Sequence, residues 1–170
     1  GSVRDAVSLL DRALISQSIS DKDTIEESNI RDMLGLADRS KILSLFNQIL
    51  KGNENESLNN LRELINDGVD AKNFLNDILE LLYIFSRRIN LGPIEKDMTI
   101  SESDLQMIDA YSKNLDMQDI GLFWQLTIKT IDDLRIIGNE NLTLEMYVMQ
   151  LVHLKKIGID KNLMNINIDN

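Results

Sequence analysis

The sequence predicts an all-α protein: a short two-helix piece followed by a six-helix bundle. Apolar residues recur at spacings of three and four along nearly the whole chain, which is the period of an amphipathic helix. No segment shows the alternation of β-branched residues between Asn-Gly or Asp-Gly turns that marks hairpins. Hydrophobic residues make up 43% and charged residues 27% of the 170 residues, so we expect a globular protein with a real core.

The first 36 residues are expected to form two helices. The first covers about residues 3–18 and has one apolar face. Thr24 and Glu27 have the spacing of a capping box that opens a second, short helix over about 24–34, and Gly35 closes it. This piece is too small to be stable alone, so we expect the chain to be an excerpt from a larger protein.

The next three helices are expected over about 38–51, 55–66 and 70–90. Glycine follows each of the first two, and Asp70 is the expected N-cap of the third, which stops before Pro93.

The helix over 70–90 is apolar around most of its circumference. Four residues widen its apolar stripe: Leu79, Leu81, Tyr83 and Ile84. Two interpretations stay open. The helix either lies at the centre of the bundle or faces both a core and a partner protein.

Three further helices complete the expected bundle. Ser101 and Asp104 resemble a capping box that opens a helix to about residue 114, and acidic residues near 116 open another that ends at Gly138. The last helix is expected over about 142–156, and residues 156–170 are expected to be a frayed tail. Phe123 and Trp124 are both predicted to lie in the core, and Met146 and Met149 to fill gaps there.

Composition excludes several classes of site. The absence of cysteine excludes disulfides, thiolate zinc sites and a cysteine nucleophile, and the motifs GxxxxGK[ST], GxGxxG, GxSxG and HExxH are all missing. Asp and Glu total 28 against 18 Lys and Arg, so the net charge of -10 opposes direct binding to nucleic acid or anionic lipid. No apolar run approaches the roughly 20 residues of a membrane span. We therefore expect no catalytic residues, no membrane contact and no enzyme in this fragment.

Two remaining features are weak candidates for a metal or acid site. His153 has no second imidazole anywhere in the chain, so any metal would need carboxylates alone as further ligands. Asp132 and Asp133 are adjacent on a helix and point about 100° apart, which favours a solvated face over a catalytic pair. The sequence therefore predicts no metal site.

Four segments, in the same order and over about 150 residues, resemble the bacterial DNA polymerase III gamma/tau family of clamp-loader ATPases. The opening GSVRDAVSLLDRAL is similar to the family's GS-x-RDA-x-SLLDQA lid motif, and residues 30–35 are similar to its V-x-x-MLG segment. Residues 74–91 resemble its long LL-x-E-LL-x-LLHRIA helix, and residues 124–151 resemble its closing stretch. The chain departs from the pattern at Ile128-Lys129, where the family often has glycine, and at Tyr147-Val148-Met149, which replaces a Thr-Leu-Leu run.

The resemblance implies that residues 1–36 are the end of the AAA+ lid domain and that 37–155 are the collar, or oligomerisation, domain. Arg4 matches the sensor 2 residue that reaches the nucleotide phosphates, a suitable role for a planar, permanently charged side chain. An ordinary solvated arginine is the alternative interpretation at this position.

The resemblance also implies partners and a setting. The full-length parent would bind ATP and Mg and load the sliding clamp in the cytoplasm, whereas the fragment would hold no cofactor. Its partners would be other gamma/tau copies and the delta and delta-prime subunits. Two alternatives stay open: a free-standing helical adaptor that binds an amphipathic helix beside residues 70–90, and an unrecognised enzyme.

Overall fold

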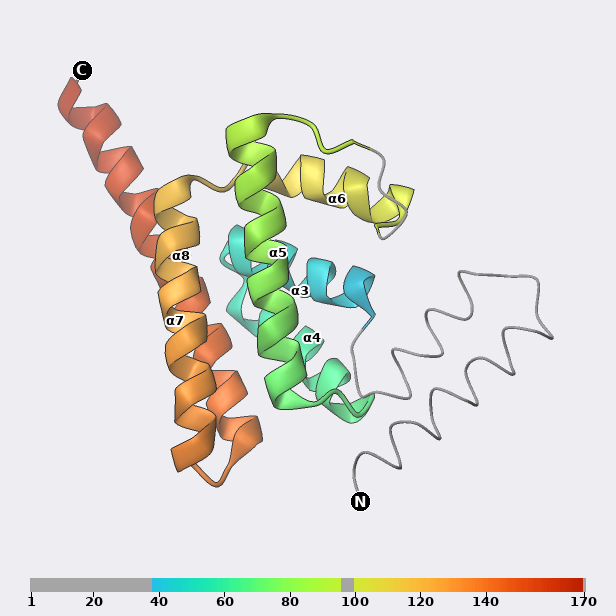
Figure 1. Cartoon of the computed structure of the whole chain (residues 1–170). Helices are drawn as coiled ribbons and strands as arrows, with labels where there is room; N and C mark the ends of the chain where they lie inside the picture. Colours follow the sequence, from blue (N-terminus) through green and yellow to red (C-terminus); the bar gives the residue numbers. More distant parts are fainter. Residues whose placement is uncertain (1–37, 96–99, 170) are drawn as a thin grey trace.

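The computed structural model describes residues 38–95 and 100–169, with side chains to residue 158. These residues form α-helices and no strand, which confirms the predicted all-α class (Figure 1). The helices expected over 3–18 and 24–34, together with Arg4, lie outside the described residues. The described helices are α3 (Arg39–Lys51), α4 (Glu54–Asn66), α5 (Ala71–Leu91), α6 (Glu102–Ser112), α7 (Met117–Ile136) and α8 (Glu140–Asp169).

Short-range capping fixes where several helices begin. Asp70 accepts a hydrogen bond from the backbone N–H of Asn73, and Ser101 accepts one from Asp104, so both predicted caps are confirmed. Asp116 and Asp119 form a reciprocal capping box at the start of α7. At the other end of α3, Gly52 adopts a φ of 77°, a left-handed conformation that favours glycine.

Antiparallel packing of neighbouring helices builds the bundle. α5 and α7 stand side by side, and α8 returns along α7 after a tight turn (Figure 1). α3 and α4 lie behind α5, where α4 packs on α3 and α8, while α6 crosses near the end of α5. Among the described residues, none of the helices is long and apolar enough to cross a membrane.

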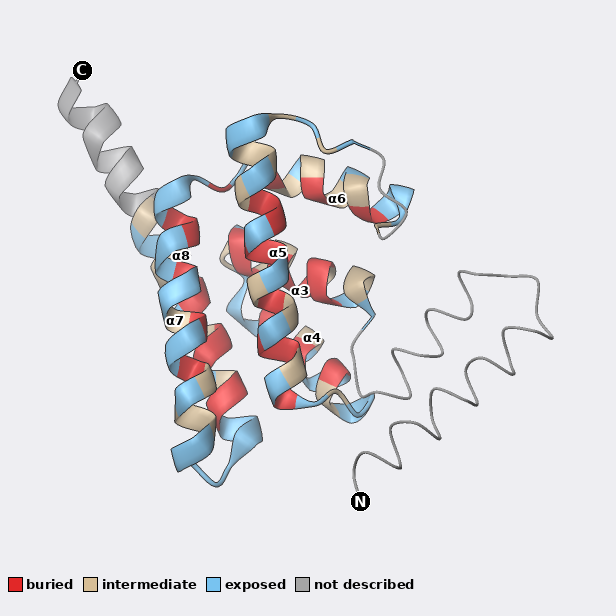
Figure 2. Cartoon of the chain, in the orientation of Figure 1, coloured by how far each residue is buried: buried red, intermediate tan, exposed pale blue. Residues whose placement is uncertain are grey.

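The core is centred on three phenylalanines from three helices. Phe46 of α3 stacks on Phe85 of α5 with ring centroids 5.3 Å apart, and meets Phe123 of α7 edge-on at 6.0 Å. All three side chains are fully buried. The buried segments of the helices lie mainly on the sides that face one another (Figure 2). This packing holds α5 and α7 at fixed positions on the bundle surface.

The wide apolar surface of α5 is mostly covered by its own bundle. Leu81 and Ile84 are buried and Leu79 is half-buried, whereas Tyr83 is 56% exposed. The interpretation of α5 as a central helix therefore accounts for most of the extra apolar residues. Only Tyr83 of that set is open to a partner.

α8 is longer than predicted. It was expected to end near Lys156, but the structure carries it to Asp169, so that boundary was wrong. Gly158 does not stop the helix because glycine in a helix interior costs only about 1 kcal/mol relative to alanine. It lies close to α7: a Cβ at this position would be 3.5 Å from Oδ1 of Asp119. Fraying over 156–170 stays a prediction.

Candidate interaction surface

One flank of α7 carries exposed apolar side chains in a line. Met117, Trp124 and Ile128 are 43%, 39% and 42% exposed, and their spacing of seven and four residues places them on one side of the helix. Gly121 lies in the same line, and nothing is within 4 Å of the position its Cβ would occupy. The stripe is therefore an open apolar ridge with a notch at the glycine.

Tyr83 of α5 continues this ridge. The side-chain amide of Asn90 donates a hydrogen bond of 3.4 Å to Sδ of Met117, which sets the register between the end of α5 and the start of α7. The two helices are antiparallel. Tyr83 lies seven residues before Asn90 on α5 and Trp124 lies seven residues after Met117 on α7, so the two side chains lie at the same level along the bundle. We call Tyr83, Met117, Trp124 and Ile128 the α5–α7 face.

Positive charge predominates around the α5–α7 face. The guanidinium of Arg87 lies over the ring of Tyr83, 6.0 Å from its centroid. Lys72 of α5 and Arg135 of α7 are exposed along the same side, where Glu80 of α5 and Asp132 of α7 are the acidic neighbours. A net positive rim is unusual in a chain whose net charge is -10.

The prediction that Trp124 lies in the core was wrong, whereas Phe123 is fully buried as predicted. Adjacent residues of a helix point about 100° apart, and on α7 the side that carries Phe123 faces the core while the side that carries Trp124 is partly exposed. The i, i+4 relation of Trp124 to Ile128 was the signal of a second apolar line on α7.

A groove between α7 and α8 forms the other exposed apolar surface. It encloses about 250 Å³ and is lined on α7 by Leu126, Thr130, Lys129 and Asp133. Three exposed apolar residues border it, Ile137, Leu142 and Met146, at 41%, 58% and 51% exposure. Met146 therefore does not fill the core as predicted, because its side of α8 faces the groove. We call this surface the α7–α8 groove.

A buried hydrogen-bond chain joins α7 to α8 beside the groove, which Tyr147 helps to line. The hydroxyl of Thr127 donates to the carbonyl of Phe123 at 2.6 Å and lies 2.7 Å from the hydroxyl of Tyr147. A threonine hydroxyl has one proton, so Tyr147 donates to Thr127. Burial raises the pKa of Tyr147 well above its ordinary value. Tyr147 therefore stays neutral and positions α7 against α8.

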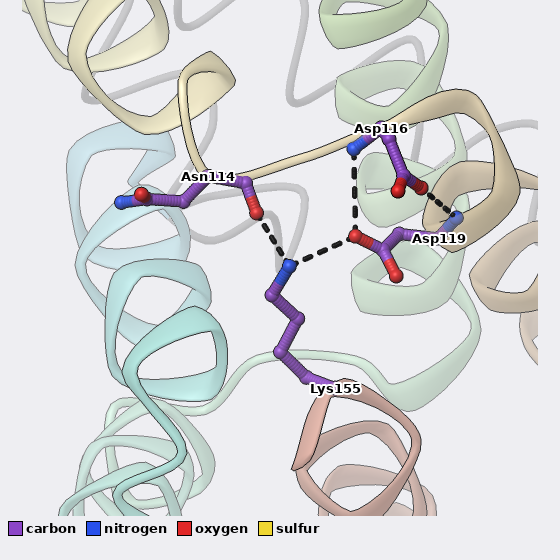
Figure 3. A network of polar contacts seen from close by, with 4 residues as sticks. All are labelled: Asn114, Asp116, Asp119 and Lys155. Atoms are coloured by element: carbon purple, nitrogen blue, oxygen red, sulfur yellow. Dashed lines mark hydrogen bonds and ion pairs between the residues drawn. The ribbon is translucent and has the colours of Figure 1, made fainter. Parts of the chain in front are cut away.

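Lys155 joins α8 to the start of α7 (Figure 3). Its ammonium donates to the carbonyl of Asn114 at 2.5 Å and to Oδ2 of Asp119 at 2.8 Å. The same carboxylate oxygen accepts from the backbone N–H of Asp116 at 3.4 Å. The sequence indicated only that acidic residues open this helix, because the lysine that completes the network lies in another helix.

The family model described as DNA polymerase III subunits gamma and tau domain III matches residues 25–165. The chain belongs to this family. No curated protein matches the chain. The match confirms the resemblance noted in the sequence, and it includes residues 30–35, 74–91 and 124–151. Domain III is the collar domain of the clamp-loader subunit, so the two surfaces described above lie on a collar.

The remaining predicted residues of this domain III do not converge on one site. His153 is exposed on α8, Asp132 is exposed, and Asp133 lines the α7–α8 groove. Among residues 38–95 and 100–158, no cluster of three or more His, Cys, Asp or Glu side chains could hold a metal ion. Arg4 precedes both the family match and the described residues. The boundary near residue 37 stays a prediction.

Proposed function

We propose that this domain III assembles the clamp loader by joining its subunits through apolar surfaces of α5, α7 and α8. One observation carries the proposal. Of the eleven large hydrophobic residues exposed in the described part of the chain, eight lie between Met117 and Met146. α3, α4 and α6 contribute none of the eleven. Exposed apolar surface concentrated on one part of a bundle is typical of a protein–protein interface.

The partners in this proposal are other gamma/tau copies and the delta and delta-prime subunits. The full-length parent would bind ATP and Mg in its ATPase module and act in the cytoplasm, where it would load the sliding clamp. Membership of the gamma/tau family supports this role. The fragment itself would contribute subunit contacts, without a cofactor and without direct binding to nucleic acid.

We also propose that residues 1–36 end the AAA+ lid and that 37–155 form the collar. Arg4 would act as the phosphate sensor of the assembled ATPase, as the similarity of the opening segment to the family's lid motif suggests. In the full-length subunit, Arg4→Ala should then lower ATP-dependent clamp loading. It should leave the sedimentation of this fragment unchanged.

The adaptor alternative has less support. It needs an apolar groove beside α5, whereas the apolar groove described above lies between α7 and α8.

Mixing the chain with the collar of a delta-prime subunit tests the assembly role. Analytical size exclusion should show a complex that elutes before either protein alone. Separate elution of the two proteins at high concentration would contradict the proposed partner.

A further inference from the structure

We propose that Met146 is an oxidation site, at which a peroxide turns the α7–α8 groove from apolar to polar and so weakens assembly. The inference rests on the assembly role proposed above and adds a chemical control on one of its surfaces.

Methionine is the residue type of this chain that a peroxide oxidises first. The chain has seven methionines and no cysteine, and the rate at which a methionine reacts depends on access to its sulfur. Among the methionines whose side chains are described, Met146 is 51% exposed and Met117 is 43% exposed. Met107 and Met149 are half-buried. Exposure therefore selects Met146 and Met117.

A hydrogen bond distinguishes these two sulfurs. The side-chain amide of Asn90 donates to Sδ of Met117 at 3.4 Å and so engages one of its lone pairs. Within the described residues, Sδ of Met146 accepts no hydrogen bond.

Oxidation uses a sulfur lone pair. The lone pair attacks one oxygen of hydrogen peroxide, and an S–O bond forms as the O–O bond breaks. The sulfur is oxidised to a sulfoxide, and the rest of the peroxide is reduced to water. Since both lone pairs of the Met146 sulfur are available, we expect Met146 to react before Met117.

The groove has little to offer a sulfoxide oxygen. Three hydroxyls line it, those of Thr130, Thr143 and Tyr147, and each already donates its proton to another oxygen of the chain. Lys129 and Gln150 are lining residues that can donate, but both are exposed. A partner that covers the groove would therefore remove water from the new oxygen without a buried donor to replace it. An apolar thioether at the same place has no such cost.

Mild treatment with hydrogen peroxide tests the site. Mass spectrometry of peptides should show that Met146 gains an oxygen atom before Met107, Met117 and Met149. Sedimentation with the delta-prime collar should then show binding weakened by about tenfold or more, the effect of leaving one buried polar group without a partner. Methionine sulfoxide reductases should restore the binding.

Three substitutions separate Met146 from the other methionines. Met146→Leu keeps an apolar side chain of similar size that cannot form a sulfoxide, so it should bind the collar equally well before and after peroxide. Met149→Leu is the matched control, because it makes the same change on α8 at a position that does not line the groove. It should lose binding after peroxide as the wild type does. Met146→Gln places a polar group in the groove and should bind weakly without any peroxide. Thermal melts must show that all three variants fold.

Other outcomes overturn the inference. If Met146 stays unoxidised while the wild type loses binding, or if Met146→Leu loses binding as the wild type does, the sensitive residue lies elsewhere. If Met146 is oxidised and binding is unchanged, oxidation does not control the groove. The assembly role survives each of these results, because the untreated protein still binds. If the untreated protein associates neither with the delta-prime collar nor with itself, the assembly role fails and this inference fails with it.

Discussion

Lys155 and Asp119 form an ion pair of 2.8 Å although they come from different helices, and each side chain is only 12% exposed. The lysine also binds the carbonyl of Asn114, so α8 is tied to the segment between α6 and α7. Both exposed apolar surfaces include residues of α7. The pair therefore helps to fix the geometry of the surfaces that we assign to assembly.

Replacing Lys155 with alanine should destabilise the fold by about 3 kcal/mol. The substitution would leave the Asp119 carboxylate without a cation at a position with little access to solvent. Removing one partner of a buried ion pair lowers stability by an amount of this size. Chemical denaturation measures the change in the free energy of unfolding. Lys156→Ala, at the exposed neighbouring position, is the control and should change it by less than about 0.5 kcal/mol. Equal effects of the two substitutions would show that the pair does not hold α8.

The neighbours Phe123 and Trp124 should respond in opposite ways to truncation. Phe123→Ala should cost about 3–5 kcal/mol of stability because it empties a fully buried site beside Phe46. Trp124→Ala should cost under about 1 kcal/mol, since the ring is partly exposed, yet it should weaken self-association. Denaturation and sedimentation of both variants check this. A large loss of stability in Trp124→Ala would place its ring in the core after all.

High pH should destabilise the protein through Tyr147. Burial raises its pKa in the folded state above the ordinary value of 10.0, so the unfolded chain releases this proton first. The contribution of neutral Tyr147 to the free energy of unfolding is complete below about pH 10. Above that pH it falls by about 1.4 kcal/mol for each pH unit. Denaturation from pH 9 to 11 should show a decline that is shallower in Tyr147→Phe. A parallel decline in both proteins would refute this role; Tyr83→Phe, at an exposed position, should follow the wild type.

Removing residues 1–37 should leave a cooperatively folding protein. The buried hydrophobic residues between Ile42 and Val152 form one cluster among the described residues, a core large enough to expect cooperative folding without the removed segment. A thermal melt of the piece spanning 38–170 should show one sharp transition. A broad, gradual loss of helical signal would mean that the first 37 residues are part of the folding unit.

Local signals in the sequence predicted most of the fold. Asp70, Ser101 and Asp116 mark helix starts because a cap involves residues only two or three positions apart. The 3.6-residue period likewise identified the buried faces of the helices. The end of α8 was missed because a glycine weakens a helix without ending it.

The candidate interaction surfaces were harder to predict. Periodicity marks apolar positions but does not say which neighbour covers them, so Trp124 and Met146 were assigned to the core. The Lys155–Asp119 pair joins residues 36 positions apart, and no local pattern indicates such a contact. The exposure of Trp124 and Met146 and the Lys155–Asp119 contact depend on how the helices pack, which only the three-dimensional structure shows.

Sedimentation equilibrium over a concentration series at low and high salt tests the central claim most directly. If apolar contacts on α5, α7 and α8 drive assembly, the average mass should rise above that of one chain as concentration rises. It should rise further in 1 M than in 0.1 M salt, because the shorter Debye length, about 3 Å against 10 Å, screens the repulsion between copies that carry -10 each. A single-chain mass at every concentration and salt, with no complex when the delta-prime collar is added, would contradict the account.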